Sequence, residues 1–300
     1  MSSTAHCTEL GPTCPVEATT YGYAPVLGAN ATLLTVFILC AIIQLVFGTW
    51  KRVYSYSFAI FFGCVLEAVG YVGRLMMHQN PWSSSGFRMQ IICLIIAPSF
   101  IAAGIYLTMK HFIRCNNPEY SFLKPQLYTW IFIGCDIGSI LLQAAGGGIA
   151  GSAGSENQHL LDIGNNVMIA GIAFQVVTMV ICGILASIYA ARRWQHRHKP
   201  AVGKFYQTTQ VFMCAVGFAY LVVLIRCIYR LPEMAGGWGN ELMRNEMEFL
   251  VLDGLMVALA SVALTIVHPA FFLPAMRTTR SEEKAYGLSS FVNSTGAIST

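Results

Sequence analysis

The sequence predicts an all-α integral membrane protein with seven transmembrane helices, an N-terminus outside the cell and a cytoplasmic C-terminus. Three observations support this fold class: 55% of the 300 residues are hydrophobic, only 11% are charged, and the apolar residues gather into seven long runs. Soluble domains normally contain about 25% charged residues. The composition therefore excludes a disordered chain, a nucleic-acid-binding protein and a soluble Rossmann or TIM-barrel enzyme.

Each apolar run is long enough to cross a bilayer as a helix, which takes roughly 20 residues. A membrane-spanning β-barrel would instead show alternating strands of about ten residues. The expected spans cover residues 27–49, 55–77, 89–110, 126–148, 165–190, 208–230 and 247–273. Short polar connections separate them, so we expect one membrane domain (27–274) between an extracellular tail (1–26) and a disordered cytoplasmic tail (275–300).

The orientation follows from the positions of lysine and arginine. The connections after the first, third and fifth spans, together with the C-terminal tail, hold 13 of the 18 Lys and Arg residues. In the opposite loops only Arg88 and Arg244 are basic. Cytoplasmic loops carry the excess of Lys and Arg, so the N-terminus is expected outside.

Several ionisable and amide side chains lie inside the apolar runs. Each needs a partner or a function, because a charge within a span costs at least about 2.5–3.5 kcal/mol. Glu67, Tyr71 and Arg74 recur at i, i+4 and i+7, which places them on one helical face. The other members are Gln44 in the first span, Asp136, Ser139 and Gln143 in the fourth, Gln175 in the fifth, Arg226 and Arg230 in the sixth and Asp253 in the seventh.

Most of these side chains share a depth in the outer half of the membrane, with Asp136 nearer the midplane. Three acids and three arginines at similar depth can neutralise one another. We expect them to face one interior cavity that opens outward and receives the polar head of an amphipathic molecule. A structural ion-pair network that fixes helix packing is the alternative interpretation, and the two are compatible.

Proline and glycine residues predict breaks and close contacts in the helices. Pro98 lies in the middle of the third span, where it removes a backbone donor. Gly146, Gly147 and Gly148 are expected to end the fourth span. Gly134 and Gly138 form a small-xxx-small face that lets another helix approach. His268-Pro269 is expected to close the last helix.

Motifs of catalysis are missing from the sequence. It contains no G-x-x-x-x-G-K-[ST] loop, no G-x-S-x-G elbow and no three histidines at zinc-site spacing. We therefore expect no enzyme, no cofactor, no metal site and no ATP site. Cys7 and Cys14 lie together in the first tail, where a disulfide can form if that tail is extracellular, and the sequence leaves their pairing open. Asn30-Ala31-Thr32 is a glycosylation sequon that abuts the first span.

The order of these residues resembles that of the fungal RTA-like family, also called the lipid-translocating exporter family. Glu67-x-x-Gly70-Tyr71-x-x-Arg74 looks like its second-helix signature. Further similar patterns are Ala97-Pro98 through Ala103 to Tyr106, Asp136-x-x-Ser139-x-x-x-Gln143-x-x-Gly146-Gly147-Gly148, Gly171-x-x-x-Gln175, Arg226-x-x-Tyr229-Arg230-x-x-Glu233, Glu246, Asp253 and His268-Pro269. The resemblance runs from about Tyr23 to Pro274, and six motifs in order across seven spans make it specific.

The resemblance implies a seven-helix protein with an outside N-terminus, which agrees with the independent charge count. It also implies resistance to toxic amphiphiles and movement of sphingoid long-chain bases from the inner to the outer leaflet. For some members it implies porphyrin or haem as a ligand. The candidate substrate-binding residues are Glu67, Tyr71, Arg74, Tyr106, Asp136, Gln143, Gln175, Arg226, Arg230 and Asp253.

The predicted function is a plasma-membrane transporter or translocation factor for amphipathic lipids. A long-chain base is a cationic amine on an alkyl tail, so Glu67, Asp136 or Asp253 would hold the ammonium while apolar helix faces or lipid accommodate the chain. A seven-helix receptor or sensor for such a ligand fits the same topology and stays open. An intramembrane lipid enzyme is disfavoured because no catalytic constellation is present. Substrate identity, direction, energy source and oligomeric state are left open by the sequence.

Overall fold

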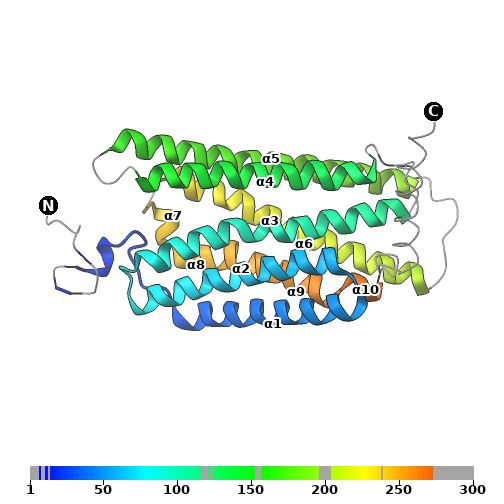
Figure 1. The fold of residues 1–300 in the computed structure, drawn as a ribbon, viewed down its shortest axis with the longest axis horizontal. Coiled ribbons are helices and arrows are strands. Elements are labelled where there is room, and N and C mark those ends of the chain that lie inside the picture. Colours follow the sequence, from blue (N-terminus) through cyan, green and yellow to red (C-terminus); the bar gives the residue numbers. More distant parts are fainter. Residues whose placement is uncertain are drawn as a thin grey trace, which may run out of the picture.

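Seven long helices run side by side along the long axis of the molecule (Figure 1). The computed structural model describes residues 7, 11–12, 14–115, 121, 124–152, 157–195, 204–237 and 239–272. The first six long helices are α1 (Leu27–Lys51), α2 (Tyr54–Gln79), α3 (Ser84–Cys115), α4 (Pro125–Ser152), α5 (Gln158–Gln195) and α6 (Lys204–Ala235). The seventh is built from α8 (Glu246–Glu248), the π-helical segment η4 (Phe249–Leu255) and α9 (Met256–Ile266). Short elements are η2 (Val16–Ala18), α7 (Glu241–Arg244) and α10 (Pro269–Phe272).

The prediction of an all-α protein with seven spans is confirmed for the described part of the chain. Seven of its helices are long and apolar enough to cross a membrane. The helices extend beyond most of the predicted spans; α5, for example, begins at Gln158 rather than at residue 165. Hydropathy identifies only the apolar part of a helix, which lies in the hydrocarbon. The helical backbone hydrogen bonds continue beyond it into the polar residues at each end of the helix. The predicted tail 275–300 lies outside the described residues.

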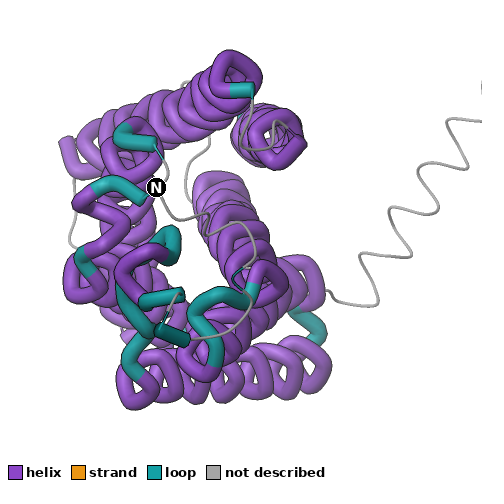
Figure 2. The backbone as a smooth tube through the Cα atoms, turned by 90° about the vertical axis from the view of Figure 1, so that its left-hand side faces the viewer, coloured by secondary structure: helices purple, strands orange, loops and turns teal. Residues whose placement is uncertain are grey.

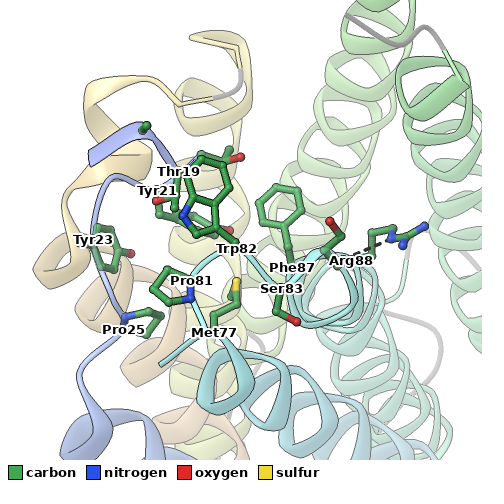
Figure 3. A pocket seen from close by; sticks show the side chains of 13 residues that line it. Thr19, Tyr21, Tyr23, Pro25, Met77, Pro81, Trp82, Ser83, Phe87 and Arg88 are labelled. Carbon is green, nitrogen blue, oxygen red and sulfur yellow. Dashed lines mark hydrogen bonds between the residues drawn. The ribbon is translucent and has the colours of Figure 1, made fainter. Parts of the chain in front are cut away.

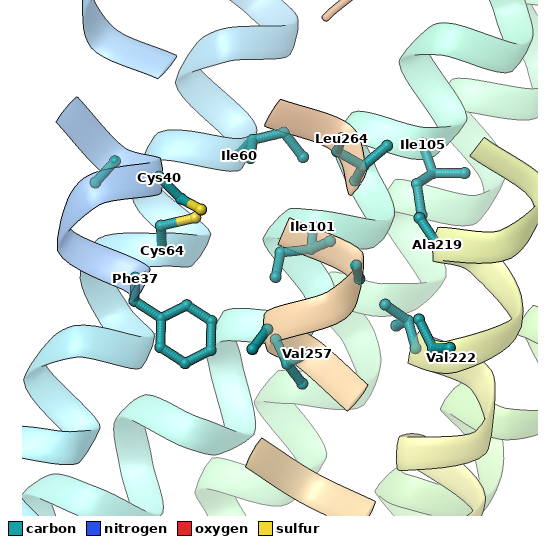
Figure 4. Close-up of a cluster of buried hydrophobic side chains, with 14 of the residues drawn as sticks. Phe37, Cys40, Ile60, Cys64, Ile101, Ile105, Ala219, Val222, Val257 and Leu264 are labelled. Atoms are coloured by element: carbon teal, nitrogen blue, oxygen red, sulfur yellow. The ribbon is translucent and has the colours of Figure 1, made fainter. Parts of the chain in front are cut away.

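The helices pack as a central group with an attached pair. α3 is the most enclosed span, with 61% of its most apolar window buried, against 28% for α1 and for α4. Apolar side chains from α1, α2, α3, α6 and α9 meet in one core, which includes Phe37, Ile60, Ile101, Val222 and Leu264 (Figure 4). α4 and α5 pack closely on each other, and they contact this group through α3 and α6.

The glycines of α4 do not act as predicted. Gly146, Gly147 and Gly148 were expected to end the helix, but α4 continues through them to Ser152. A Cβ at Gly146 would lie 2.5 Å from the Met168 backbone nitrogen of α5, so this glycine permits close helix contact. Gly134 has open space around it and a Cβ at Gly138 would lie 4.0 Å from the Phe174 ring of α5, so no helix of the described chain approaches closely at that face.

The last helix ends as the sequence predicts. α9 ends at Ile266, and the Ala270 backbone N–H donates to Nδ1 of His268 (3.1 Å) at the start of α10. Nε2 of His268 lies 3.1 Å from the Ser57 hydroxyl of α2. His268 is fully buried, and it joins the end of the seventh helix to the start of the second.

The segment before α1 lies across one end of the bundle (Figure 2). Cys7 and Cys14 form a disulfide, which the sequence had left conditional. Trp82, in the α2–α3 turn, donates its indole N–H to the Cys14 carbonyl (3.4 Å). His78 Nδ1, at the end of α2, lies 2.7 Å from the Pro25 carbonyl. These contacts fix the segment over the ends of α2 and α3.

Candidate functional site

Arg74 is the centre of a polar cluster near the start of α1. Its Nε donates to the Asn30 amide oxygen (2.7 Å), and one terminal nitrogen donates to Glu246 (3.0 Å) and to the Tyr23 hydroxyl (3.2 Å). The guanidinium also lies 4.2 Å from the Phe249 ring centroid, within cation–π range. Arg74 thereby ties α2 to α1, to the seventh helix and to the segment before α1.

Burial and hydrogen bonding make Asn30 and Tyr23 part of this cluster. Asn30 is fully buried, and its amide donates to Glu246 (3.2 Å) and to the Val26 carbonyl (2.6 Å). The sequon at Asn30 is therefore inaccessible in the folded protein. Burial raises the pKa of the Tyr23 hydroxyl above the ordinary tyrosine value, although Arg74 opposes the shift. Tyr23 thus stays neutral beside the Arg74–Glu246 ion pair.

Arg226 of α6 joins three helices deeper in the bundle. Its Nε lies 2.7 Å from the Asp253 carboxylate of η4. A terminal nitrogen donates to the Leu94 carbonyl of α3. That carbonyl has no helical partner, because the residue four positions later is Pro98, which lacks an N–H. The proline predicted to disrupt α3 therefore creates an acceptor that an arginine from another helix satisfies.

Arg230 lies one turn along α6 and pairs within its own helix. Its guanidinium lies 2.8 Å from the Glu233 carboxylate, and both side chains are buried. The Asn240 amide donates to the Glu233 backbone carbonyl (2.6 Å), which links this pair to the loop before α7. The pair lies at the same end of the bundle as Arg74.

Within the part of the chain that the structure describes, Glu67 is buried without an ion-pair or hydrogen-bond partner. It is 1% exposed, and neither carboxylate oxygen has a hydrogen-bond partner among the described residues. Arg226, Arg230 and Asp253 are close enough to act on it electrostatically. The Tyr71 hydroxyl, one turn along α2, is also buried without a hydrogen bond within the described chain. Glu67 is thus a carboxyl group surrounded by arginines that other acids already neutralise.

A second polar group lies between α3, α4 and α5. Asp136 is 3% exposed, and the Tyr106 side chain of α3 acts on its carboxyl group. Further along, Gln143 donates to Gln175 (3.2 Å), which in turn donates to the Ser99 hydroxyl (2.9 Å) beside Pro98. These contacts join Gln143 of α4 to Gln175 of α5, and Gln175 to Ser99 of α3.

The structure thus divides the predicted site residues into two groups. Glu67, Tyr71, Arg226, Arg230 and Asp253 lie together between α2, α6 and η4, with Arg74 toward the segment before α1. Tyr106, Asp136, Gln143 and Gln175 lie between α3, α4 and α5. The sequence did not identify Asn30, Tyr23 or Glu233 as members of the site. Asn30 is a polar residue within the first predicted span, and this position could have identified it as a site residue. The sequence analysis instead considered Asn30 only as part of a glycosylation sequon.

Two pockets lie outside both groups. The larger, of about 550 Å³, is formed by the segment before α1 and the α2–α3 turn, and Tyr21, Tyr23, Trp82 and Phe87 line it (Figure 3). The smaller, of about 310 Å³, lies between α1 and α2 near Gln44 and Phe61. The rings of Tyr21 and Tyr23 are 5.9 Å from the Arg74 guanidinium, so the larger pocket borders the Arg74 cluster. An open cavity around Glu67 itself stays a prediction.

Comparisons with known proteins place this helical framework among fungal membrane proteins. The chain is 34% identical over 289 residues to the sphingoid long-chain base transporter RSB1 of Saccharomyces cerevisiae, covering 86% of this chain and 75% of the relative. It is 29% identical over 222 residues to protoporphyrin uptake protein 1 of the same species, covering 70% of this chain and 68% of that protein.

A third relative is protein RTM1 of Saccharomyces cerevisiae, which is 27% identical over 225 residues, covering 73% of this chain and 69% of that protein. No solved structure matches the chain. The family described as RTA1 like protein matches residues 60–276, which include α3 to α9 and most of α2. The protein therefore belongs to the RTA1-like family, in agreement with the resemblance seen in its sequence motifs.

Proposed function

We propose that this protein moves cationic amphipathic lipids, such as sphingoid long-chain bases, across the plasma membrane toward the outer leaflet. The similarity to a sphingoid long-chain base transporter supports the substrate class. The observation that carries the proposal is Glu67, a carboxyl group that is buried in a candidate membrane span and has no ion-pair partner among the described residues. Such a group in a span is a functional-site candidate, because burying it costs free energy and no ion pair within the described chain offsets that cost.

The ammonium group of a long-chain base binds at Glu67. Asp253 is less suited, because Arg226 already holds its carboxylate at 2.7 Å. Asp136 has a tyrosine as its neighbour rather than an arginine, so it offers a second position along the path. Charge-assisted contacts between ammonium and carboxylate are about twice as strong as neutral hydrogen bonds. The alkyl chain lies against the apolar helix faces or in lipid.

The N-terminus lies outside the cell and the C-terminus in the cytoplasm. The distribution of Lys and Arg supports this orientation. The Cys7–Cys14 disulfide fits an oxidising, extracellular environment for the first tail. The Arg74 cluster and the pocket at Trp82 then lie at the outer end of the bundle, and Glu67 lies seven residues, about 10 Å, below Arg74. The protein acts as a carrier rather than as an enzyme.

Resistance of cells to a toxic long-chain base tests the proposal. In cells whose survival depends on this protein, Glu67→Gln should abolish resistance at normal surface abundance, since the amide cannot neutralise an ammonium. Asp136→Asn should reduce resistance, and Glu241→Gln, which changes an exposed acid outside the site, should leave it unchanged. Unaltered resistance in the combined Glu67→Gln, Asp136→Asn variant would refute the proposal.

Reconstitution separates transport from the other function classes. Purified protein in lipid vesicles should accelerate the movement of a labelled sphingoid base between leaflets. Binding without such movement would indicate a receptor or sensor. Conversion of the base to another compound would indicate an enzyme.

A further inference from the structure

The buried charges around Glu67 do not balance. Four carboxyl groups (Glu67, Glu233, Glu246 and Asp253) lie near three guanidinium groups (Arg74, Arg226 and Arg230). Each arginine has its own acid within 3.0 Å, and only Glu246 is partly exposed, at 13% of its side chain. Three ion pairs therefore account for three of the carboxyl groups. Glu67 is the fourth.

An unpaired carboxylate at this position is too costly to persist. Placing an isolated ion in a medium of low dielectric constant costs so much free energy that the group takes up a proton instead. The neighbours of Glu67 cannot remove this cost, because each nearby cation is already neutralised. The groups that face it are Cys64 and Tyr71 on α2, Cys93 on α3, Arg226 and Arg230 on α6 and Asp253 on η4. The cluster is neutral when it holds one proton or one monovalent cation.

We propose that Glu67 exchanges one proton for one cationic amphiphile, so that the protein is an electroneutral proton/ammonium exchanger. This inference rests on the proposed function, since it takes Glu67 as the ammonium site. The step is balanced: the ammonium enters, the O–H bond of the Glu67 carboxyl group breaks, the electron pair stays on the carboxylate, and the proton leaves to water. The reverse step releases the amphiphile and returns a proton to Glu67.

Two features of transport follow from this stoichiometry. A proton gradient is sufficient as the energy source, because each ammonium that crosses one way is matched by a proton that crosses the other way. The membrane potential has no effect on the equilibrium, because no net charge crosses. An acidic exterior therefore drives the base outward, which is the direction that confers resistance.

The experiment uses a permanently charged ligand. An ordinary long-chain amine crosses membranes in its neutral form and follows a pH gradient without any protein, so a labelled single-chain trimethylammonium amphiphile is the better probe. Its binding to purified protein in weakly buffered detergent should release about one proton per molecule bound. The Kd should fall about tenfold for each unit of pH increase while Glu67 is protonated in the free protein.

Substitutions at Glu67 test whether the released proton comes from this residue. Glu67→Gln should neither bind the probe nor release a proton, whereas Glu67→Asp should do both. Glu241→Gln is the matched control and should behave as the unaltered chain does. A thermal unfolding transition of normal cooperativity shows that Glu67→Gln is folded. Proton release that persists in a folded Glu67→Gln variant would overturn the assignment.

The outcomes distinguish this inference from the proposed function. Binding of the probe with no proton release and a Kd independent of pH would overturn the exchange and leave the proposed function standing. Failure of both the probe and a sphingoid base to bind would overturn both.

In vesicles, an imposed pH gradient of one unit should accumulate the probe about tenfold on the acidic side, with no change when the membrane potential is collapsed. Accumulation that follows the potential instead would overturn electroneutrality.

Discussion

Arg226 shows how one side chain replaces a backbone hydrogen bond that the sequence removes. Pro98 leaves the Leu94 carbonyl of α3 without an N–H donor, and the Arg226 guanidinium supplies one from α6. The same guanidinium neutralises Asp253 in η4. Backbone groups within hydrocarbon must be satisfied by the protein itself, so Arg226 has a structural role in addition to its place beside Glu67.

Removing the Arg226 charge should destabilise the protein strongly. Arg226→Met leaves Asp253 without its partner and the Leu94 carbonyl without a donor, and loss of one partner of a buried pair costs about 3–5 kcal/mol. The free energy of unfolding in detergent micelles measures the effect. The double variant Arg226→Met, Asp253→Leu removes both charges and should recover the part of the loss that comes from the unpaired Asp253, while the Leu94 carbonyl still lacks its donor. A single variant as stable as the unaltered chain would contradict this role.

Among the helices, α4 and α5 depend on glycine for their contact. A Cβ on Gly146 would lie 2.6 Å from the Gly164 carbonyl, and one on Gly164 would lie 2.5 Å from the Ala150 backbone nitrogen. These obstacles are backbone atoms, which cannot move aside as a flexible side chain can. Small residues that let backbones approach are common at helix interfaces in membranes, and here they let the backbones of α4 and α5 approach each other.

The glycines of α4 provide a matched test of this contact. Gly146→Ala should lower the thermal unfolding temperature in detergent, because α4 and α5 must separate to admit the methyl group. Gly147→Ala, at a position with open space, should be neutral or stabilise the helix by about 0.5–1 kcal/mol through backbone entropy. Equal effects of the two substitutions would contradict the packing.

At the scale of the whole molecule, the polar groups lie at defined levels of the bundle. The Arg74 cluster, the pocket at Trp82 and the segment before α1 occupy one end, and His268 with Ser57 occupies the other. The helix exteriors carry exposed apolar residues such as Leu39, Leu141 and Leu221, which suits contact with lipid.

The orientation of the molecule can be tested with single cysteines. Ser85→Cys, exposed at the start of α3, should react with a membrane-impermeant maleimide in intact cells. Gln126→Cys, exposed at the start of α4, should react only after the membrane is permeabilised. The unaltered chain provides the background from its own thiols. The opposite labelling pattern would reverse the assigned topology.

The sequence by itself determined the seven spans, because crossing a bilayer requires a continuous apolar run and the chain contains seven. It also identified Glu67, Asp136 and Asp253 as acids that need a partner, since their positions within apolar runs are local properties. It failed at Gly146–Gly148, where local propensity predicts a helix end. Packing against α5 instead makes these glycines part of a continuous helix.

Only the tertiary structure decided which charges pair. Arg74 and Glu67 share one face of α2, yet Arg74 pairs with Glu246 of the seventh helix and Glu67 pairs with none of the residues that the structure describes. Ion pairing depends on distances of a few ångströms between helices that are far apart in the sequence, and periodicity along one helix carries no information about them. For the same reason the sequence could not show that Asn30, which stands out only as part of a sequon beside the first span, accepts a hydrogen bond from Arg74.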